Sequence, residues 1–293
     1  MGDRRPRGRR SRGSGRAAAW GDSTPGALLA HRALPVDTGR ATGHPCAAAR
    51  STMPTVDLRG HRILDLSQPI EPGMWDYRPL GVPVQPVQVD RIAELGRDGF
   101  NLSEFLINGL TGSYIESAHH MNDEAPTLDR FDLRRLIRPA RIMRLPPAEP
   151  WTLYTVDDLR RADPGLQEGE ALVMVTGWDK ARQRIPDYVT AGPALAASTL
   201  SWFLDQPLSM WATDMTVADC LWGPEHGHPE EAGTDLLKSL YEARPDLLLL
   251  APLCRLAEIQ GDVGTIIALG PNIPGTCAVP ARVLFIEGVR IEV

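Results

Sequence analysis

Short apolar runs, separated by glycine, proline and acidic residues, recur along the chain from about residue 57 onward. Runs of this length that are rich in β-branched residues and bounded by turn residues are typical of β-strands. We therefore predict strands at residues 62–66, 84–89, 102–108, 140–145, 171–176, 208–213, 265–269 and 282–287.

Helical periodicity is less frequent. The segment TVDDLRRA begins with Thr155 as an N-cap and carries Asp158 three residues later, close to a capping box. The segment STLSWFLD, which starts at Ser198, has apolar residues at helical spacing, and residues 234–241 are a third candidate helix. Many short strands with few helices indicate a mixed α/β domain over residues 56–293.

The charge is distributed unevenly along the chain. Residues 1–50 hold ten arginines against three aspartates, a net +7, which leaves −13 for the remainder of a chain whose total is −6. We predict that residues 1–55 are a disordered Arg-rich tail, because they have no periodic apolar face to bury. We favour an extended start with Met53 as the true first residue, while charge-driven attachment or a transit peptide stays open.

The acidic body argues against nucleic acid as a partner. The longest apolar run, LLLLAPL, is too short to span a bilayer, so we expect no membrane partner. The four cysteines form no C-x-x-C pair and no secretory signal is visible, which predicts a cytoplasmic protein with reduced thiols. Cys220 and Cys254 are interpreted as small buried residues.

The stretch LTGSYIESAHHM, residues 110–121, holds the densest candidate chemistry. Read as a strand, its central part alternates, which places Tyr114 and Glu116 on one face. A turn then delivers His119 and His120, so Glu116 and one histidine are expected to converge. From the residues alone, a metal site, a carboxylate–imidazole proton relay and a simple polar network all remain open.

Several segments in a fixed order carry a family resemblance: DLSQPIEPGMWDYRP, TGSYIESAHH, VTGWDK, PALAASTLSWFLD, WATDMT and PGTCAVPARV. Together they resemble the "putative cyclase" family, which includes bacterial kynurenine formamidase, isatin hydrolase and cyclases of aromatic polyketide pathways. The resemblance runs from about residue 58 to 291. It implies a swivelling β/β/α domain, with a mixed β-sheet core flanked by helices, that forms a homodimer or a larger homo-oligomer.

The family signature is His-x-Gly-Thr-His-x-Asp-x-Pro-x-His, in which the first two histidines and the aspartate bind a divalent metal and the last histidine is catalytic. Laid on this chain, the metal-ligand positions fall on Leu110, Tyr114 and Glu116, and the catalytic position falls on His120. A downstream glutamate ligand of the family falls near Ala251. Two histidine ligands are therefore replaced, and one carboxylate is lengthened.

These replacements predict that no metal or other cofactor is used. Leucine and alanine cannot coordinate an ion, and a catalytic zinc site needs about three protein ligands. A rebuilt site from Glu116 with His119 or His120, together with Asp214 or with His226 or His228, remains the alternative.

The same polar cluster suggests a catalytic set. We predict that His120 and Glu116 move a proton and that Tyr114 polarises a substrate oxygen. Substrate-binding candidates are Trp75, Tyr77, Asp214, His119 and Ser113. The alternative for Tyr114, Trp75 and Tyr77 is ordinary packing in the core or in a loop. The alternative for Asp214 is a cap at a strand end, and the alternative for His119 is a solvated or supporting role.

The leading functional hypothesis is a metal-independent cyclase, dehydratase or isomerase of antibiotic biosynthesis, acting on a natural-product, polyketide-type intermediate. The second is a metal-dependent amide or lactone hydrolase of formamidase type. The third is a non-catalytic pseudoenzyme that binds a ligand. In each case the partner is a small molecule.

Overall fold

A computed structural model of the chain describes residues 58–222, 224–228, 230–231 and 235–291. The predicted tail of residues 1–55 lies outside the described residues. The strands are β1 (Ile63–Asp65), β2 (Gln88–Ala93), β3 (Leu102–Leu106), β4 (Tyr114–Ser117), β5 (Ile137–Arg144), β6 (Leu153–Tyr154), β7 (Ala171–Val175), β8 (Ala194–Leu195), β9 (Met210–Thr213), β10 (Leu248–Ala251), β11 (Val263–Leu269), β12 (Ala278–Pro280) and β13 (Arg282–Glu287). The α-helices are α1 (Leu95–Asp98), α2 (Val156–Ala162), α3 (Asp187–Thr190), α4 (Thr199–Asp205) and α5 (Leu236–Ala243).

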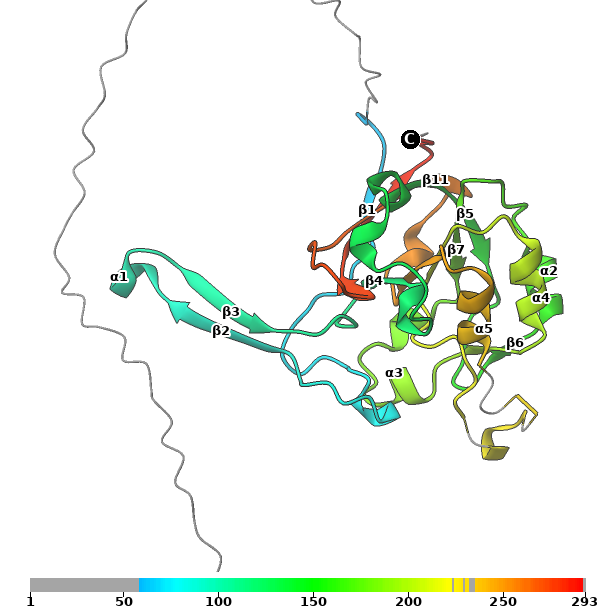
Figure 1. The fold of residues 1–293 in the computed structure, drawn as a ribbon, viewed down its shortest axis with the longest axis horizontal. Helices are drawn as coiled ribbons and strands as arrows, with labels where there is room; N and C mark the ends of the chain where they lie inside the picture. The colour runs from blue at the N-terminus through cyan, green and yellow to red at the C-terminus, as the bar shows by residue number, and fades with distance from the viewer. Residues whose placement is uncertain (1–57, 223, 229, 232–234, 292–293) are drawn as a thin grey trace, which may run out of the picture. The chain divides into compact units, whose positions relative to one another are not determined.

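In the described part of the chain, nine strands form one mixed sheet in the order β1-β13-β11-β5-β7-β9-β10-β4-β12. The four central strands β5, β7, β9 and β10 are parallel, and the outer strands on both sides are antiparallel to their neighbours. Figure 1 shows this sheet with α2, α4 and α5 beside it. The predicted mixed α/β fold is confirmed.

The sheet curls around an apolar cluster to which all nine strands contribute. Ile115 of β4, Val279 of β12 and Phe285 of β13 lie in this cluster, although their strands belong to opposite parts of the sheet order. A Cβ added to Gly270, just after β11, would lie 2.7 Å from Val279, so β11 and β12 approach each other closely. One face of the sheet is therefore buried by the sheet itself.

The opposite face is covered by helices. Leu172 of β7 and Trp211 of β9 pack there against Phe203 of α4 and Leu240 of α5. The capping box predicted at Thr155 is present at the start of α2. This second apolar layer forms the surroundings of the candidate site.

Most predicted strands are present, with one clear correction. The strand expected at residues 84–89 begins only at Gln88, because Pro86 has no N–H to donate to a sheet ladder. Strand β10, by contrast, was not predicted, since its run of leucines shows neither alternation nor β-branching. No described helix has both the length and the apolar character needed to cross a membrane.

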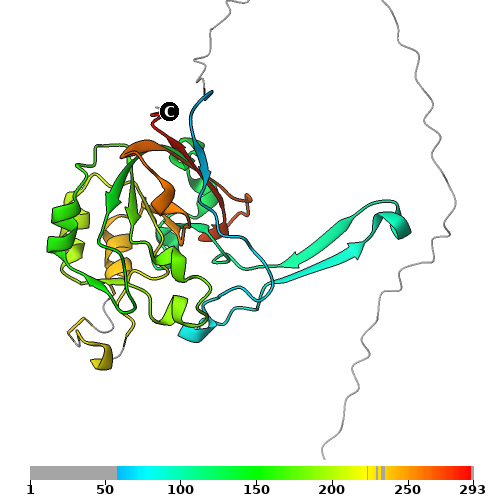
Figure 2. The same cartoon turned by 180° about the vertical axis from the view of Figure 1, so that it is seen from behind.

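Strands β2 and β3 form a separate hairpin, the hairpin arm (residues 88–106), which extends away from the sheet in both views (Figures 1 and 2). Its large apolar side chains are exposed on both faces. They are Val89, Ile92, Leu95, Phe100, Leu102, Phe105 and Leu106.

Candidate active site

Strand β4 positions the core of the site. It lies between β10 and β12 and is antiparallel to both, with Glu116 opposite Leu249 and Ala278. Alternation along the strand sends Ile115 into the curled core and Tyr114 to the helix-covered layer. Glu116 lies on the same side as Tyr114, as predicted, and only 2% of its surface is exposed.

A 3₁₀ turn at Ala118–His120 follows β4 directly and turns His120 back toward the strand. His120 Nδ1 lies 3.9 Å from Glu116 Oε2. His119 points elsewhere, because its Nδ1 lies 3.0 Å from the carbonyl oxygen of Ala125. The predicted convergence of Glu116 with one histidine therefore involves His120.

Three tyrosines surround this pair. The Tyr241 hydroxyl of α5 donates to Glu116 Oε1 at 2.7 Å, and the hydroxyls of Tyr77 and Tyr114 are 3.0 Å apart. Tyr77 donates its single proton to the carbonyl of Thr216 at 2.8 Å, so Tyr114 must be the donor to Tyr77. The Tyr114 proton is thus held by another tyrosine and would have to turn to reach a ligand.

Burial shifts the pKa values of the two members of this pair in opposite directions. It raises the pKa of Glu116 to about 7, against the opposing effect of the Tyr241 hydrogen bond. It also lowers the pKa of His120 below its usual value. A carboxyl group with a pKa of about 7 can give or take a proton near neutral pH, and an imidazole of lowered pKa is a neutral base there.

A cavity of about 120 Å³ opens beside these groups. Glu116, His120, Tyr77 and Tyr114 line it together with residues of β9, β10 and α5. Its walls are mainly apolar, and they include Leu110, Met121, Trp211, Met215, Leu237 and Ala251. The predicted catalytic residues and Tyr77 are therefore brought to one small cavity.

Trp75 lies behind this cavity rather than in its wall. Its ring meets those of Tyr77 and Tyr188 edge to face, and its Nε1 donates to the Gln68 side chain at 2.7 Å. Only 4% of Trp75 is exposed. In this structure Trp75 supports Tyr77, and its predicted contact with a substrate stays a prediction.

The remaining candidates lie outside the cavity wall. Asp214 is fully buried and accepts hydrogen bonds from the backbone N–H and the hydroxyl of Thr176. These contacts resemble the strand-end cap that was the alternative interpretation of Asp214. The Ser113 hydroxyl donates to the carbonyl of Pro252 at 2.7 Å. Substrate binding by Asp214, Ser113 and His119 stays a prediction with no direct contact in its favour.

The four positions that the family resemblance assigns to metal ligands do surround the cavity. Leu110, Tyr114, Glu116 and Ala251 all line it, so the position-by-position assignment is spatially consistent. Their donor set does not fit a divalent ion, however, because two are hydrocarbon side chains and burial holds the pKa of the Tyr114 phenol well above its usual value. Among the described residues, no group of three or more His, Cys, Asp or Glu side chains is arranged to hold a metal.

The histidines proposed as substitute ligands do not repair this set. His226 and His228 are absent from the cavity wall, and the His226 ring stacks on Trp151 with 4.2 Å between centroids. We therefore derive no catalytic step through a metal.

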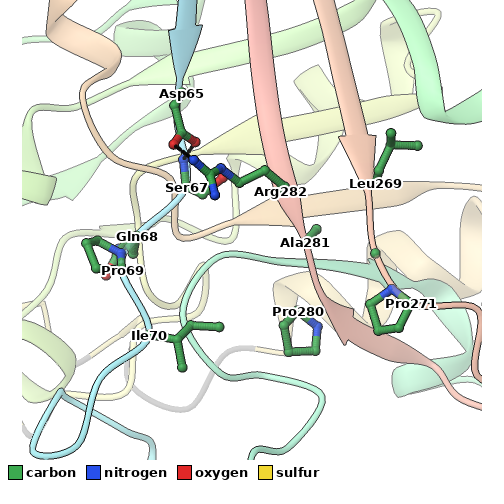
Figure 3. A pocket seen from close by; sticks show the side chains of 11 residues that line it. Asp65, Ser67, Gln68, Pro69, Ile70, Leu269, Pro271, Pro280, Ala281 and Arg282 are labelled. Atoms are coloured by element: carbon green, nitrogen blue, oxygen red, sulfur yellow. Dashed lines mark hydrogen bonds and ion pairs between the residues drawn. The ribbon is translucent and has the colours of Figure 1, made fainter. Parts of the chain in front are cut away.

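A larger cavity of about 550 Å³ lies outside the Glu116–His120 cluster (Figure 3). The Asp65 carboxylate forms an ion pair with the Arg282 guanidinium at 2.5 Å, and the two side chains face each other in Figure 3. Partial burial acts to raise the pKa of Asp65, but hydrogen bonds from Arg282 and Ser67 hold it below its usual value. A carboxylate fixed in this way is a poor proton donor or acceptor near neutral pH, so the smaller cavity is the better candidate for chemistry.

A curled mixed sheet, covered by helices on one face and carrying a carboxylate–imidazole pair on that face, defines an α/β protein. The sequence pattern of the "putative cyclase" family matches residues 64–220, more than half of the chain, and the chain belongs to that family. No curated protein matches it.

Solved structures show the same fold at low sequence identity. Isatin hydrolase A from Ralstonia solanacearum is 19% identical with a TM-score of 0.67, over 82% of this chain and 100% of that one. An isatin hydrolase bound to the product analogue thioisatinate is 20% identical with a TM-score of 0.64, over 79% and 93%. A potential metal-dependent hydrolase with cyclase activity is 21% identical with a TM-score of 0.58, over 78% and 99%.

Proposed function

We propose that this protein is an enzyme that promotes a cyclisation, dehydration or isomerisation of a small molecule by acid/base catalysis, without a divalent metal. The observation that carries the proposal is the Glu116–His120 pair, a buried carboxyl group and an imidazole whose nearest oxygen and nitrogen are 3.9 Å apart at the wall of one cavity. The metal-ligand positions of the family surround the same cavity but offer leucine, tyrosine and alanine side chains with a single carboxylate, Glu116.

In this proposal His120, which is neutral near pH 7, removes a proton from the substrate. Glu116, which is close to half protonated at that pH, returns a proton to another atom of the substrate. Tyr114 turns its hydroxyl from Tyr77 to a developing negative charge on oxygen. Acid/base catalysis of this kind accelerates reactions by about 10²–10⁴-fold, and restricting a flexible chain near its reacting geometry adds to this.

The apolar walls and the small volume of the cavity suit a largely apolar substrate of which only one end enters. Pockets that enclose a whole drug-sized ligand measure roughly 300–1,000 Å³, whereas this one measures about 120 Å³. His120 lies at the rim, with 30% of its side chain exposed. We infer that the reacting end of a polyketide-type intermediate reaches Glu116 while the rest of the molecule stays outside.

The test is product formation by the full chain from synthetic polyketide-type substrates that can close a ring. His120→Ala and Glu116→Gln should each slow product formation by about 100-fold or more, while His61→Ala serves as a matched histidine control that does not line the cavity. Wild-type rates in both site variants would refute catalysis by this pair, and no product above the uncatalysed rate in the wild type would point to the non-catalytic, ligand-binding role.

A hydrolase is the second candidate, because isatin hydrolases share this fold. It requires a metal held by a set of side chains that the described residues do not bring together. It predicts that amide or lactone hydrolysis appears only when zinc or manganese is added, and that His120→Ala removes the metal response.

We also propose a homodimer or larger homo-oligomer. The hairpin arm leaves about half of the Phe105 and Leu106 surfaces exposed, at 64% and 45%. An isolated two-stranded hairpin is marginally stable in water, so a covering surface is expected. A second copy of the chain is the partner that we propose.

A cytoplasmic location is supported by Cys220, Cys254 and Cys277, none of which forms a disulfide.

A further inference from the structure

His120 has a second reactive neighbour that the acid/base proposal does not use. The Cys277 thiol lies 3.7 Å from His120 Nδ1, the same nitrogen that faces Glu116 Oε2 at 3.9 Å. The imidazole nitrogen therefore stands between a thiol and a buried carboxylate. Sequence reasoning gave Cys277 no role.

The sheet fixes this arrangement. Cys277 directly precedes β12, and Ala278 at the start of that strand is paired with Glu116. The backbone N–H of Ser117 donates to the carbonyl of Cys277 at 2.8 Å. The thiol is thus held at the end of β4, where the 3₁₀ turn places His120.

Cys277 differs from the other described cysteines in accessibility. Cys220 and Cys254 are buried, as the sequence predicts, and the Cys254 thiol contacts the carbonyl of Ser67 at 3.2 Å. Cys277 is partly exposed and contacts His120, which is itself partly exposed, although Cys277 does not line the cavity wall. Only this described thiol combines access from solvent with a neighbouring base.

The resting pair is neutral. Burial, followed by the charge of Glu116, raises the pKa of Cys277, and burial lowers the pKa of His120. A thiol beside a neutral imidazole is activated when the imidazole accepts its proton during attack, as in serine–histidine pairs. This requires His120 to carry its proton on Nε2, so that Nδ1 is free to accept. The imidazolium that forms then faces the Glu116 carboxylate.

We propose that Cys277 is a nucleophile of this site, and that the substrate carries an acyl group activated as a thioester or an ester. The inference rests on the proposed function and names the class of substrate. Cys277 Sγ attacks the carbonyl carbon while its proton passes to His120 Nδ1. The new Sγ–C bond replaces the bond to the leaving thiol or alcohol, which departs with its electron pair and takes the proton from His120.

The second half of the reaction releases the acyl group. A hydroxyl or enol of the same acyl chain attacks the carbonyl carbon and gives its proton to His120. The Sγ–C bond then breaks, the ring is closed, and the Cys277 sulfur recovers the proton. No oxidant, reductant or added cofactor is needed for this sequence.

The test uses two acetyl donors with the full chain: p-nitrophenyl acetate as an ester and S-acetyl-N-acetylcysteamine as a thioester. Mass spectrometry of the peptide that contains Cys277 should locate the acetyl group there. His120→Ala should slow this acetylation by about 100-fold, and Cys254→Ser, a control at a buried thiol, should leave it within about twofold. With each rate divided by that of the same donor with free cysteine, preference for the thioester would favour a thioester substrate, and preference for the ester would favour an ester substrate.

An acetyl group found elsewhere, or Cys277 acetylation that is equally fast in His120→Ala, would overturn the inference, because any exposed thiol reacts slowly with an activated ester. Ring closure at the wild-type rate in Cys277→Ala would also overturn it while leaving acid/base catalysis by His120 and Glu116 intact. If Cys277→Ala does not fold, the position of the acetyl group in the wild-type chain and its dependence on His120 decide the question.

Discussion

Replacement of Glu116 by glutamine should stabilise the fold at alkaline pH relative to the wild type. Burial raises the pKa of Glu116 from 4.5 to about 7, so the folded protein keeps a proton that the unfolded chain releases between these values. Stability from this group is complete below pH 4.5 and is lost as the pH rises through 7. The shift of 7 − 4.5 = 2.5 units corresponds to a loss on the order of 3 kcal/mol at 1.36 kcal/mol per unit.

Glutamine does not ionise, and its side-chain oxygen can still accept the Tyr241 hydrogen bond. Its amide group can add a cost of its own, but that cost does not change with pH. The difference in unfolding free energy between Glu116→Gln and wild type should therefore grow in favour of the variant by roughly 2.5 kcal/mol between about pH 5 and pH 8.5, since part of the loss has already occurred at pH 5.

Urea unfolding of both proteins across this pH range measures the difference directly. Other titrating groups, His120 among them, are common to both proteins and largely cancel in the subtraction. A difference that stays constant with pH would refute the reasoning, because it would mean that the Glu116 carboxyl ionises in the folded state as it does in water.

Three further outcomes are expected. Tyr241→Phe removes a hydrogen bond that lowers the pKa of Glu116, so the limb of the pH–rate profile that reports Glu116 should move to higher pH, whereas Tyr154→Phe should leave that limb in place. Thr155→Ala removes the capping box of α2 and should lower the free energy of unfolding by about 1 kcal/mol in urea titration. Phe105→Asp on the hairpin arm should shift the mass measured by light scattering toward the monomer; an unchanged mass would exclude the arm from the interface.

The alternation of the candidate strand and the turn after it were predictable from the sequence. A strand has a period of two, so Tyr114 and Glu116 had to share a face, and a short turn could bring His120 back to Glu116. These are local relations over a few residues. The structure places all three side chains at one cavity for this reason.

Tyr241 and Cys277 could not be assigned in this way. They are 125 and 157 residues away in sequence from the side chains that they contact, Glu116 and His120. Their positions depend on the pairing of β10 and β12 with β4, and neither β10 nor β12 was predicted as a strand. Tyr241 also occupies an ordinary buried position of an amphipathic helix, where nothing in the pattern marks it as polar chemistry.

The substrate-covering role predicted for Trp75 shows a second limit. An aromatic residue in a Pro/Gly-rich loop is compatible with a ligand wall and with core packing alike. The packing of Trp75 against Tyr77 and Tyr188, and its hydrogen bond to Gln68, are set by segments that meet only in the folded chain.

The central claim is that the Glu116–His120 cavity works without a metal, and calorimetric titration of the purified, chelator-treated chain with zinc and manganese tests it most directly. A variant with Leu110→His and Tyr114→His, which adds two imidazoles beside Glu116, is the positive control for a rebuilt site. We predict that the variant gains saturable binding of the metal, whereas the wild type has no metal binding that depends on His120. Treatment with chelator should leave the activity of the wild type unchanged. Stoichiometric binding of zinc or manganese to the wild type, lost in His120→Ala and accompanied by loss of activity with chelator, would contradict the account.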